Sequence, residues 1–145
     1  MILQFDVSFA TQDIGTIITS EHGEVTRAAL VIAKARGWHS TWLNEGVSIY
    51  LSRDADRHLR SYGAFPSASR IGLRVQVAQP QCLLALKLRA LQAGGRDLED
   101  VAMLARHLGL RSAEDLLAVL RANFPDEPLD ARGLLVVSDI SGKLA

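Results

Sequence analysis

The stretch that decides the fold reads Pro80-Gln81-Cys82-Leu83-Leu84-Ala85-Leu86-Lys87-Leu88-Arg89-Ala90-Leu91 and, after Gly94-Gly95, continues as Arg96-Asp97-Leu98-Glu99-Asp100. Pro80 suits the first turn of a helix, and the apolar residues behind it recur with helical spacing. On that spacing leucines and alanines surround Lys87, so its ammonium group needs either a route to water along its own stem or an anionic partner. The acidic run beyond the glycines supplies candidate partners.

Asp97 and Asp100 lie three residues apart at the expected start of a second helix. Their carboxylates therefore share one face, near the positive end of the helix dipole. Acids in a first turn also cap a helix without any further role. If the two helices pack antiparallel across the Gly-Gly turn, the Lys87 side chain can approach these acids. The spacing thus predicts a Lys–Asp pair, with helix capping as the alternative.

Periodicity and turn residues predict an α/β chain of the α+β type, with a small sheet followed by a helical half. Strands are predicted at 14–19 and 71–77 and, less clearly, at 47–51; helices are predicted at 21–36, 80–91, 97–107 and 112–124. In the strand at 71–77, alternation places Ile71, Leu73, Val75 and Val77 inward. Residues 53–70, which contain Gly63 and Pro66, are expected to form a loop or a broken helix, and residues 130–140 have no clear pattern. We expect one domain over residues 1–145, with an α/β part at 1–79 and a helical part at 80–145.

Composition limits the classes of function. At 145 residues the chain can bury roughly 70% of the surface of its unfolded form. Sixteen basic and sixteen acidic residues cancel, which excludes a protein that binds polyanions through its total charge. The charge is unevenly placed, since residues 53–74 carry five arginines against two aspartates, and residues 112–145 carry six acids against three bases. The arginine-bearing segment is either a face that attracts phosphates or a solvated loop.

Cellular location is indicated by three negative signs. Cys82 is the only cysteine, so the chain forms no internal disulfide, which fits a reducing cytoplasm. No apolar run approaches the roughly 20 residues that span a bilayer. The first residues lack the basic and apolar regions of a signal peptide. We expect a cytoplasmic protein without membrane contact.

Asp13 precedes the first expected strand. A carboxylate at a strand edge can hold Mg²⁺ together with substrate phosphates, or it can simply be a turn residue. The histidines have no spacing that indicates zinc, and the chain has no Walker-type loop.

Five pieces of the sequence, in their order and spacing, resemble one family over residues 8–130. They are Thr11-Gln12-Asp13-Ile14, Trp42-Leu43-Asn44, the apolar helix that carries Lys87, Arg96-Asp97-Leu98-Glu99-Asp100, and Phe124-Pro125 with a further proline three residues later. With these pieces the chain resembles nucleotidyltransferase-fold proteins related to the AbiEii-like toxins of bacterial abortive-infection and toxin–antitoxin systems. The resemblance implies a small mixed sheet followed by a helical half, and Mg²⁺-dependent transfer of a nucleotidyl group from a nucleoside triphosphate to a hydroxyl of RNA or protein.

The resemblance also implies roles for individual residues. Asp13 becomes the catalytic carboxylate that binds Mg²⁺, and Lys87 and Asp97 complete the catalytic set. Lys87, Arg96 and Asp100 become the nucleotide-binding residues.

Departures from the family pattern point to impaired or absent activity. Gly15 stands where the second metal-binding carboxylate belongs, and the family's Gly-Gly turn is missing because the chain starts beyond its position. The strand at 71–77 offers no third carboxylate. The alternative is a non-catalytic binding module, in which a second copy or an antitoxin-like partner covers the strand edge left open. A plain helical interaction module would explain the second half alone.

Overall fold

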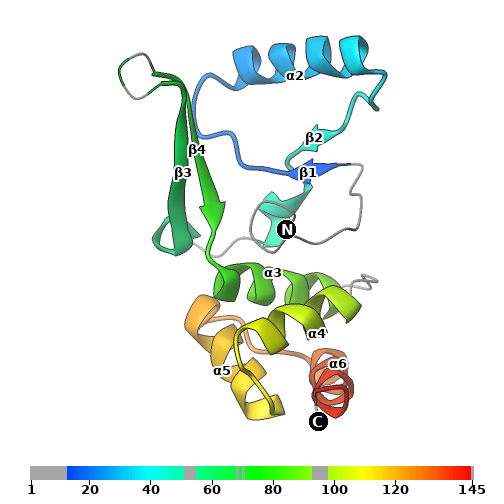
Figure 1. The fold of residues 1–145 in the computed structure, drawn as a ribbon. Helices are drawn as coiled ribbons and strands as arrows, with labels where there is room; N and C mark the ends of the chain where they lie inside the picture. Colours follow the sequence, from blue (N-terminus) through cyan, green and yellow to red (C-terminus); the bar gives the residue numbers. More distant parts are fainter. Residues whose placement is uncertain (1–12, 51–54, 68, 70, 93–97, 145) are drawn as a thin grey trace. The chain divides into compact units, whose positions relative to one another are not determined.

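The computed structural model in Figure 1 describes residues 13–50, 55–67, 69, 71–92 and 98–144. The α+β class is confirmed, because these residues form helices and two small sheets, with the helices dominating the second half. The chain divides into two compact units, Met1–Ile49 and Tyr50–Ala145. That both units belong to one domain stays a prediction.

The described part of the first unit is built around two parallel strands joined by a helix. Strand β1 (Ile14–Gly15) pairs with β2 (Leu43–Asn44), and helix α2 (His22–Arg36) lies between them in the chain. The predicted helix is confirmed, including its end at Gly37, whose φ of 66° favours glycine. The first strand is shorter than the predicted 14–19.

The strand predicted at 47–51 is wrong, because Gly46–Tyr50 form the 3-10 helix η1. The side chain of Asn44 accepts a hydrogen bond from the Gly46 amide at 3.0 Å, and the Ser48 amide donates to the Glu45 carbonyl at 2.9 Å. These local bonds turn the backbone immediately after β2, which overrides the β preference of the following residues.

Burial in the first unit is slight. Among its described residues only Ala29 and Ala33 are buried, whereas large apolar side chains are exposed at Leu30, Val31, Ile32 and Trp38. The Trp42 indole donates a hydrogen bond to the Ala29 carbonyl at 2.9 Å. The Trp38 and Trp42 rings pack edge to face, with their centroids 5.1 Å apart. A polar contact and an aromatic pair therefore connect the β2 region to α2.

The second unit begins with the 3-10 helix η2 (Ala55–His58) and an antiparallel hairpin, β3 (Leu59–Pro66) with β4 (Ile71–Ala78). The strand at 71–77 is confirmed, whereas the loop or broken helix expected at 53–70 is wrong where β3 stands. Gly63 lies next to a β-bulge and Pro66 is the last strand residue, and strands tolerate glycine and proline at such positions. The inward orientation predicted for Leu73 is also wrong, since Leu73 is exposed.

Four helices complete the second unit: α3 (Pro80–Gln92), α4 (Leu98–His107), α5 (Ala113–Asn123) and α6 (Ala131–Gly142). Helix α3 contacts each of the other three. The largest fully buried side chains lie on these four helices: Leu84, Leu88, Val101, Leu104, Leu116 and Ile140. The core of the described chain therefore surrounds the helix that carries Lys87.

Side-chain caps define where the last two helices begin. Ser112 and Asp115 form a capping box at the start of α5, and Asp130 caps α6 because its Oδ1 accepts a hydrogen bond from the Gly133 amide at 2.8 Å. The segment without a clear sequence pattern, 130–140, is thus helical. None of the helices in the described ranges has the length and apolar character needed to cross a membrane.

Candidate functional site

Lys87 and Asp100 form an ion pair between α3 and α4. The Lys87 Nζ lies 2.8 Å from Asp100 Oδ2, and the two side chains are 18% and 33% exposed. The predicted contact between Lys87 and an acid at the start of the next helix is therefore confirmed for Asp100. Arg96, Asp97 and the Gly-Gly turn lie outside the described residues.

The surroundings of Lys87 explain the direction of its side chain. The residues one helical turn away include Leu84 and Leu91, both buried, so the stem lies against apolar side chains. Asp100 stands in the first turn of α4, where a carboxylate also interacts favourably with the helix dipole. The ion pair and the favourable interaction with the helix dipole are therefore compatible for Asp100.

A second cation of α3 is paired as well. The Arg89 guanidinium donates to Glu127 and lies over the Phe124 ring, 5.5 Å from its centroid. Arg89 thus holds α3 to the segment after α5, whereas Lys87 holds it to α4. The side chain of Lys87 is the less exposed member of its own ion pair.

Asp13 belongs to the first unit and is exposed, one residue before β1. Its Oδ2 accepts a hydrogen bond from Asn44 Nδ2 at 3.1 Å. The Gly46 amide donates to Asn44 Oδ1, which fixes the orientation of that amide group. Because Gly15 pairs with Asn44 and strand residues two apart share a face, Asp13, Gly15 and Asn44 lie on one face of the parallel pair.

The described residues of this face do not offer the ligand set that Mg²⁺ prefers. Asn44 directs a donor toward Asp13 and uses its oxygen on the Gly46 amide, so among these described residues the carboxylate of Asp13 is the anionic group. Within the described ranges, no group of three His, Cys, Asp or Glu side chains is placed to hold a metal ion. A Cβ added at Gly15 would meet Val47 Cβ at 3.4 Å, which is ordinary contact. The backbone therefore accommodates a Cβ at the position where the family pattern expects a carboxylate.

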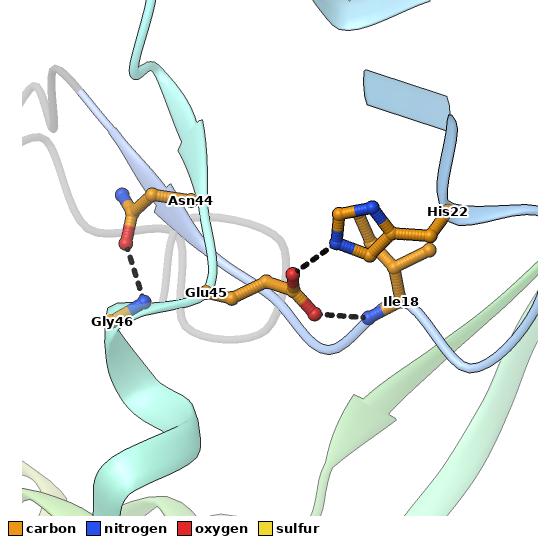
Figure 2. A network of polar contacts seen from close by, with 5 residues as sticks. All are labelled: Ile18, His22, Asn44, Glu45 and Gly46. Atoms are coloured by element: carbon orange, nitrogen blue, oxygen red, sulfur yellow. Dashed lines mark hydrogen bonds and ion pairs between the residues drawn. The ribbon is translucent and has the colours of Figure 1, made fainter. Parts of the chain in front are cut away.

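Glu45, immediately after β2, forms a polar network that the sequence did not reveal (Figure 2). Its Oε1 accepts the Ile18 amide at 3.0 Å, and its Oε2 lies 2.6 Å from His22 Nε2. The Ile18 amide, followed by His22, lowers the pKa of the Glu45 carboxyl. The network joins the end of β2 to the segment between β1 and α2, across a separation of 27 residues.

No local spacing in the sequence links Glu45 with His22. An acid directly after Trp42-Leu43-Asn44 was the one signal available in the sequence. Both side chains are accessible, at 34% and 62% exposure.

Of the sequence-predicted site residues, the structure pairs only Lys87 and Asp100 with each other among the described positions. Asp13 meets Asn44 in the first unit, and Lys87 meets Asp100 in the second. No protein-family model matches the chain, and neither a curated protein nor a solved structure does. The nucleotidyltransferase resemblance therefore stays a prediction based on the quoted motifs.

Proposed function

We propose that the chain is a nucleotidyltransferase-like protein, related to bacterial abortive-infection toxins, that binds a nucleoside triphosphate in the cytoplasm and has impaired or no transfer activity. The observation that carries this proposal is the Lys87–Asp100 pair at 2.8 Å. The family resemblance assigns both residues to nucleotide binding, although they come from separate motifs. A partly buried ammonium group that pairs with a carboxylate can exchange this partner for a phosphate group. An intact enzyme of this type would transfer the nucleotidyl group to a hydroxyl of RNA or protein.

The Asp13 face supports the second half of the proposal. Asp13 stands beside β1 with Asn44 as its hydrogen-bond partner, and Gly15 offers no side-chain ligand on the same face. Tight Mg²⁺ binding in proteins generally needs more than one oxygen ligand besides water and substrate phosphate. A chain with one carboxylate here would bind nucleotide more readily than it would catalyse transfer.

An ordinary structural ion pair is the competing explanation of Lys87, and a nucleotide titration separates the two. Each of the four ribonucleoside triphosphates is titrated with Mg²⁺ into the wild type, Lys87→Met and Lys87→Arg by calorimetry. Methionine keeps the apolar stem and removes the charge, so we expect affinity to fall about tenfold, with part of it restored by arginine. Lys34→Met, an exposed lysine near the end of α2, is the matched control and should leave affinity unchanged.

The proposal fails if the wild type binds none of the four nucleotides, or if Lys87→Met binds them as the wild type does. Circular dichroism of each variant establishes that the helices remain, so that a loss of affinity can be assigned to the substituted side chain and not to unfolding.

The second candidate function is a non-catalytic binding module that forms a homodimer or holds an antitoxin-like protein. It is favoured by the exposed apolar side chains of α2, because the described part of the first unit buries only two alanines. Large apolar surfaces of this kind are usually covered in an assembly. Sedimentation equilibrium over a wide concentration range tests the homodimer. Association that Val31→Glu abolishes would support it, and a monomer throughout would exclude it.

A further inference from the structure

The hairpin of the second unit carries two exposed aromatic rings on one face. Tyr62 and Phe65 are 48% and 44% exposed, and their rings are inclined by 28° with centroids 6.5 Å apart. A Cβ added at Gly63 would meet the Phe65 ring at 3.3 Å, so the ring lies directly over this glycine. Tyr62 is the extra residue of the β-bulge between Ser61 and Gly63.

The strand register identifies what else lies on this face. Leu73, Val75 and Val77 alternate along β4, and they pair with Phe65, Gly63 and Arg60 respectively. Arg60 therefore shares the face of Phe65, whereas Arg74, which pairs with Ala64, lies on the opposite face. Both arginines are exposed. We call Arg60, Tyr62, Phe65 and Leu73 the hairpin face.

The charge of the hairpin is entirely positive. Between Arg57 and Ala78 the sequence contains arginines and a histidine but no acidic residue, although the whole chain is neutral. The next two cations along the chain, Lys87 and Arg89, have carboxylate partners at Asp100 and Glu127. The hairpin is thus a local cationic surface in a protein that does not attract polyanions by its total charge.

We propose that the hairpin face binds a single-stranded nucleic acid, with bases stacked on Tyr62 and Phe65 and the phosphate backbone held by Arg60. Exposed aromatic rings flanked by cations are the arrangement that sequence-tolerant single-strand binding requires, because every base has a stacking surface and every nucleotide a phosphate. A protein partner would bind the apolar side chains whether or not acidic residues surrounded them, so the absence of acidic residues between Arg57 and Ala78 favours a polyanion. This inference deepens the proposed function by naming nucleic acid as the acceptor of the nucleotidyl group. Only that role rests on the proposed function, because binding itself is argued from the hairpin face.

The test measures binding without nucleotide or Mg²⁺, so that a missing nucleotide site cannot produce a negative result. Fluorescence anisotropy follows labelled RNA and DNA single strands of roughly 16 nucleotides, and a duplex of the same sequence, titrated with the wild type at low salt. We expect binding of the single strands and weaker binding of the duplex. Tighter binding of the RNA single strand than of the DNA single strand would support RNA as the acceptor. Equal binding would show that the face recognises the bases and phosphates that RNA and DNA share.

Two pairs of variants place the binding on the hairpin face. Tyr62→Leu and Phe65→Leu keep apolar side chains but remove the stacking rings, so each should weaken binding about tenfold. Trp38→Leu removes an exposed ring from the first unit and should have no effect. Arg60→Gln should reduce the salt dependence, lowering the slope of log K against log salt by about 0.7, whereas Arg74→Gln on the opposite face should change it less.

Three results would overturn the inference. They are an absence of binding by the wild type at low salt, unchanged affinity in both leucine variants of the hairpin, and an equal decrease of the salt-dependence slope in Arg60→Gln and Arg74→Gln. Self-association that Phe65→Leu abolishes, without nucleic-acid binding, would also overturn it and assign the face to a second copy of the chain.

Discussion

The two units differ in what holds them together. In the second unit, α3–α6 bury leucines, valines and an isoleucine against one another, and Leu84 and Leu104 are completely inaccessible. In the described part of the first unit, two alanines are buried, and contacts of Trp42 with Ala29 and of Glu45 with His22 join the β2 region to α2. Burial of large apolar side chains is the main favourable term in folding, so the free energy of unfolding should be concentrated in the helical half.

A core truncation should show this contrast most strongly. Leu84→Ala removes a fully buried side chain from α3 and should lower the free energy of unfolding by about 2–5 kcal/mol. Val31→Ala in α2 removes a side chain that is 65% exposed and should change stability by less than about 0.5 kcal/mol. Urea unfolding followed by circular dichroism measures both. Equal losses of stability in Leu84→Ala and Val31→Ala would show that the first unit has a core of its own.

Breaking the Lys87–Asp100 pair should have the next largest effect. Asp100→Asn removes the carboxylate that the partly buried Lys87 ammonium group contacts and should cost about 2 kcal/mol. Glu99→Gln removes an exposed acid from the same helical turn and serves as the control. Adding Lys87→Met to Asp100→Asn should recover part of the loss, which a double-mutant cycle measures. Strict additivity of the two substitutions would mean that the pair contributes nothing to the fold.

The capping box of α5 should contribute less. Ser112→Ala removes the acceptor of the Asp115 amide and should lower stability by about 1 kcal/mol. Ser138→Ala on the exposed side of α6 is the matched control and should be close to neutral. Thermal unfolding of the two variants beside the wild type makes the comparison. A loss shared by both would argue against capping as the cause.

Acidification should weaken the same capping box. The Arg111 amide, then the Ser112 side chain and amide, lower the pKa of the Asp115 carboxyl. Its contribution is therefore fully present above the ordinary value of 3.8 and is lost as the pH falls through the lower folded-state pKa. The wild type should lose more stability than Asp115→Asn between neutral and strongly acidic pH. Parallel pH profiles would contradict this assignment.

The smallest effect on global stability is expected from Glu45, although it should be visible locally. Its pKa is also lowered, so its hold on the Ile18 amide persists above the ordinary value of 4.5 and weakens as the pH falls through the folded-state pKa. Glu45→Gln should accelerate hydrogen exchange at the Ile18 amide and leave the amides of α3–α6 unchanged. Exchange that increased throughout the second unit would show that the two units unfold together.

The sequence was most informative where one helix buried a continuous apolar face. Leucines at helical spacing located α3, and the isolated cation among them predicted the contact that Lys87 makes with Asp100. Ser112 and Gly37 marked a helix start and a helix end because their chemistry acts within a few residues. Each of these signals is local.

Predictions failed where a single side-chain bond, a strand irregularity or a contact over a long sequence separation decides the structure. Gly63 and Pro66 suggested a loop, but the bulge and the strand end accommodate them within β3. Residues 47–51 have β-forming side chains, yet the bond between Asn44 and the Gly46 amide begins a 3-10 helix. The Glu45–His22 contact spans 23 residues and has no periodic signal.

We propose that Lys87 binds nucleotide and that the face of Asp13 lacks one metal-binding carboxylate, at Gly15. The most direct measurement is a calorimetric titration of the four ribonucleoside triphosphates, with and without Mg²⁺, into the wild type and Gly15→Asp. Gly15→Asn controls for size, and Gly23→Asp adds the same charge at an open position in the first turn of α2. We predict that nucleotide affinity in Mg²⁺ rises in Gly15→Asp alone. Unchanged affinity in that variant, or an equal rise in Gly23→Asp, would contradict the account.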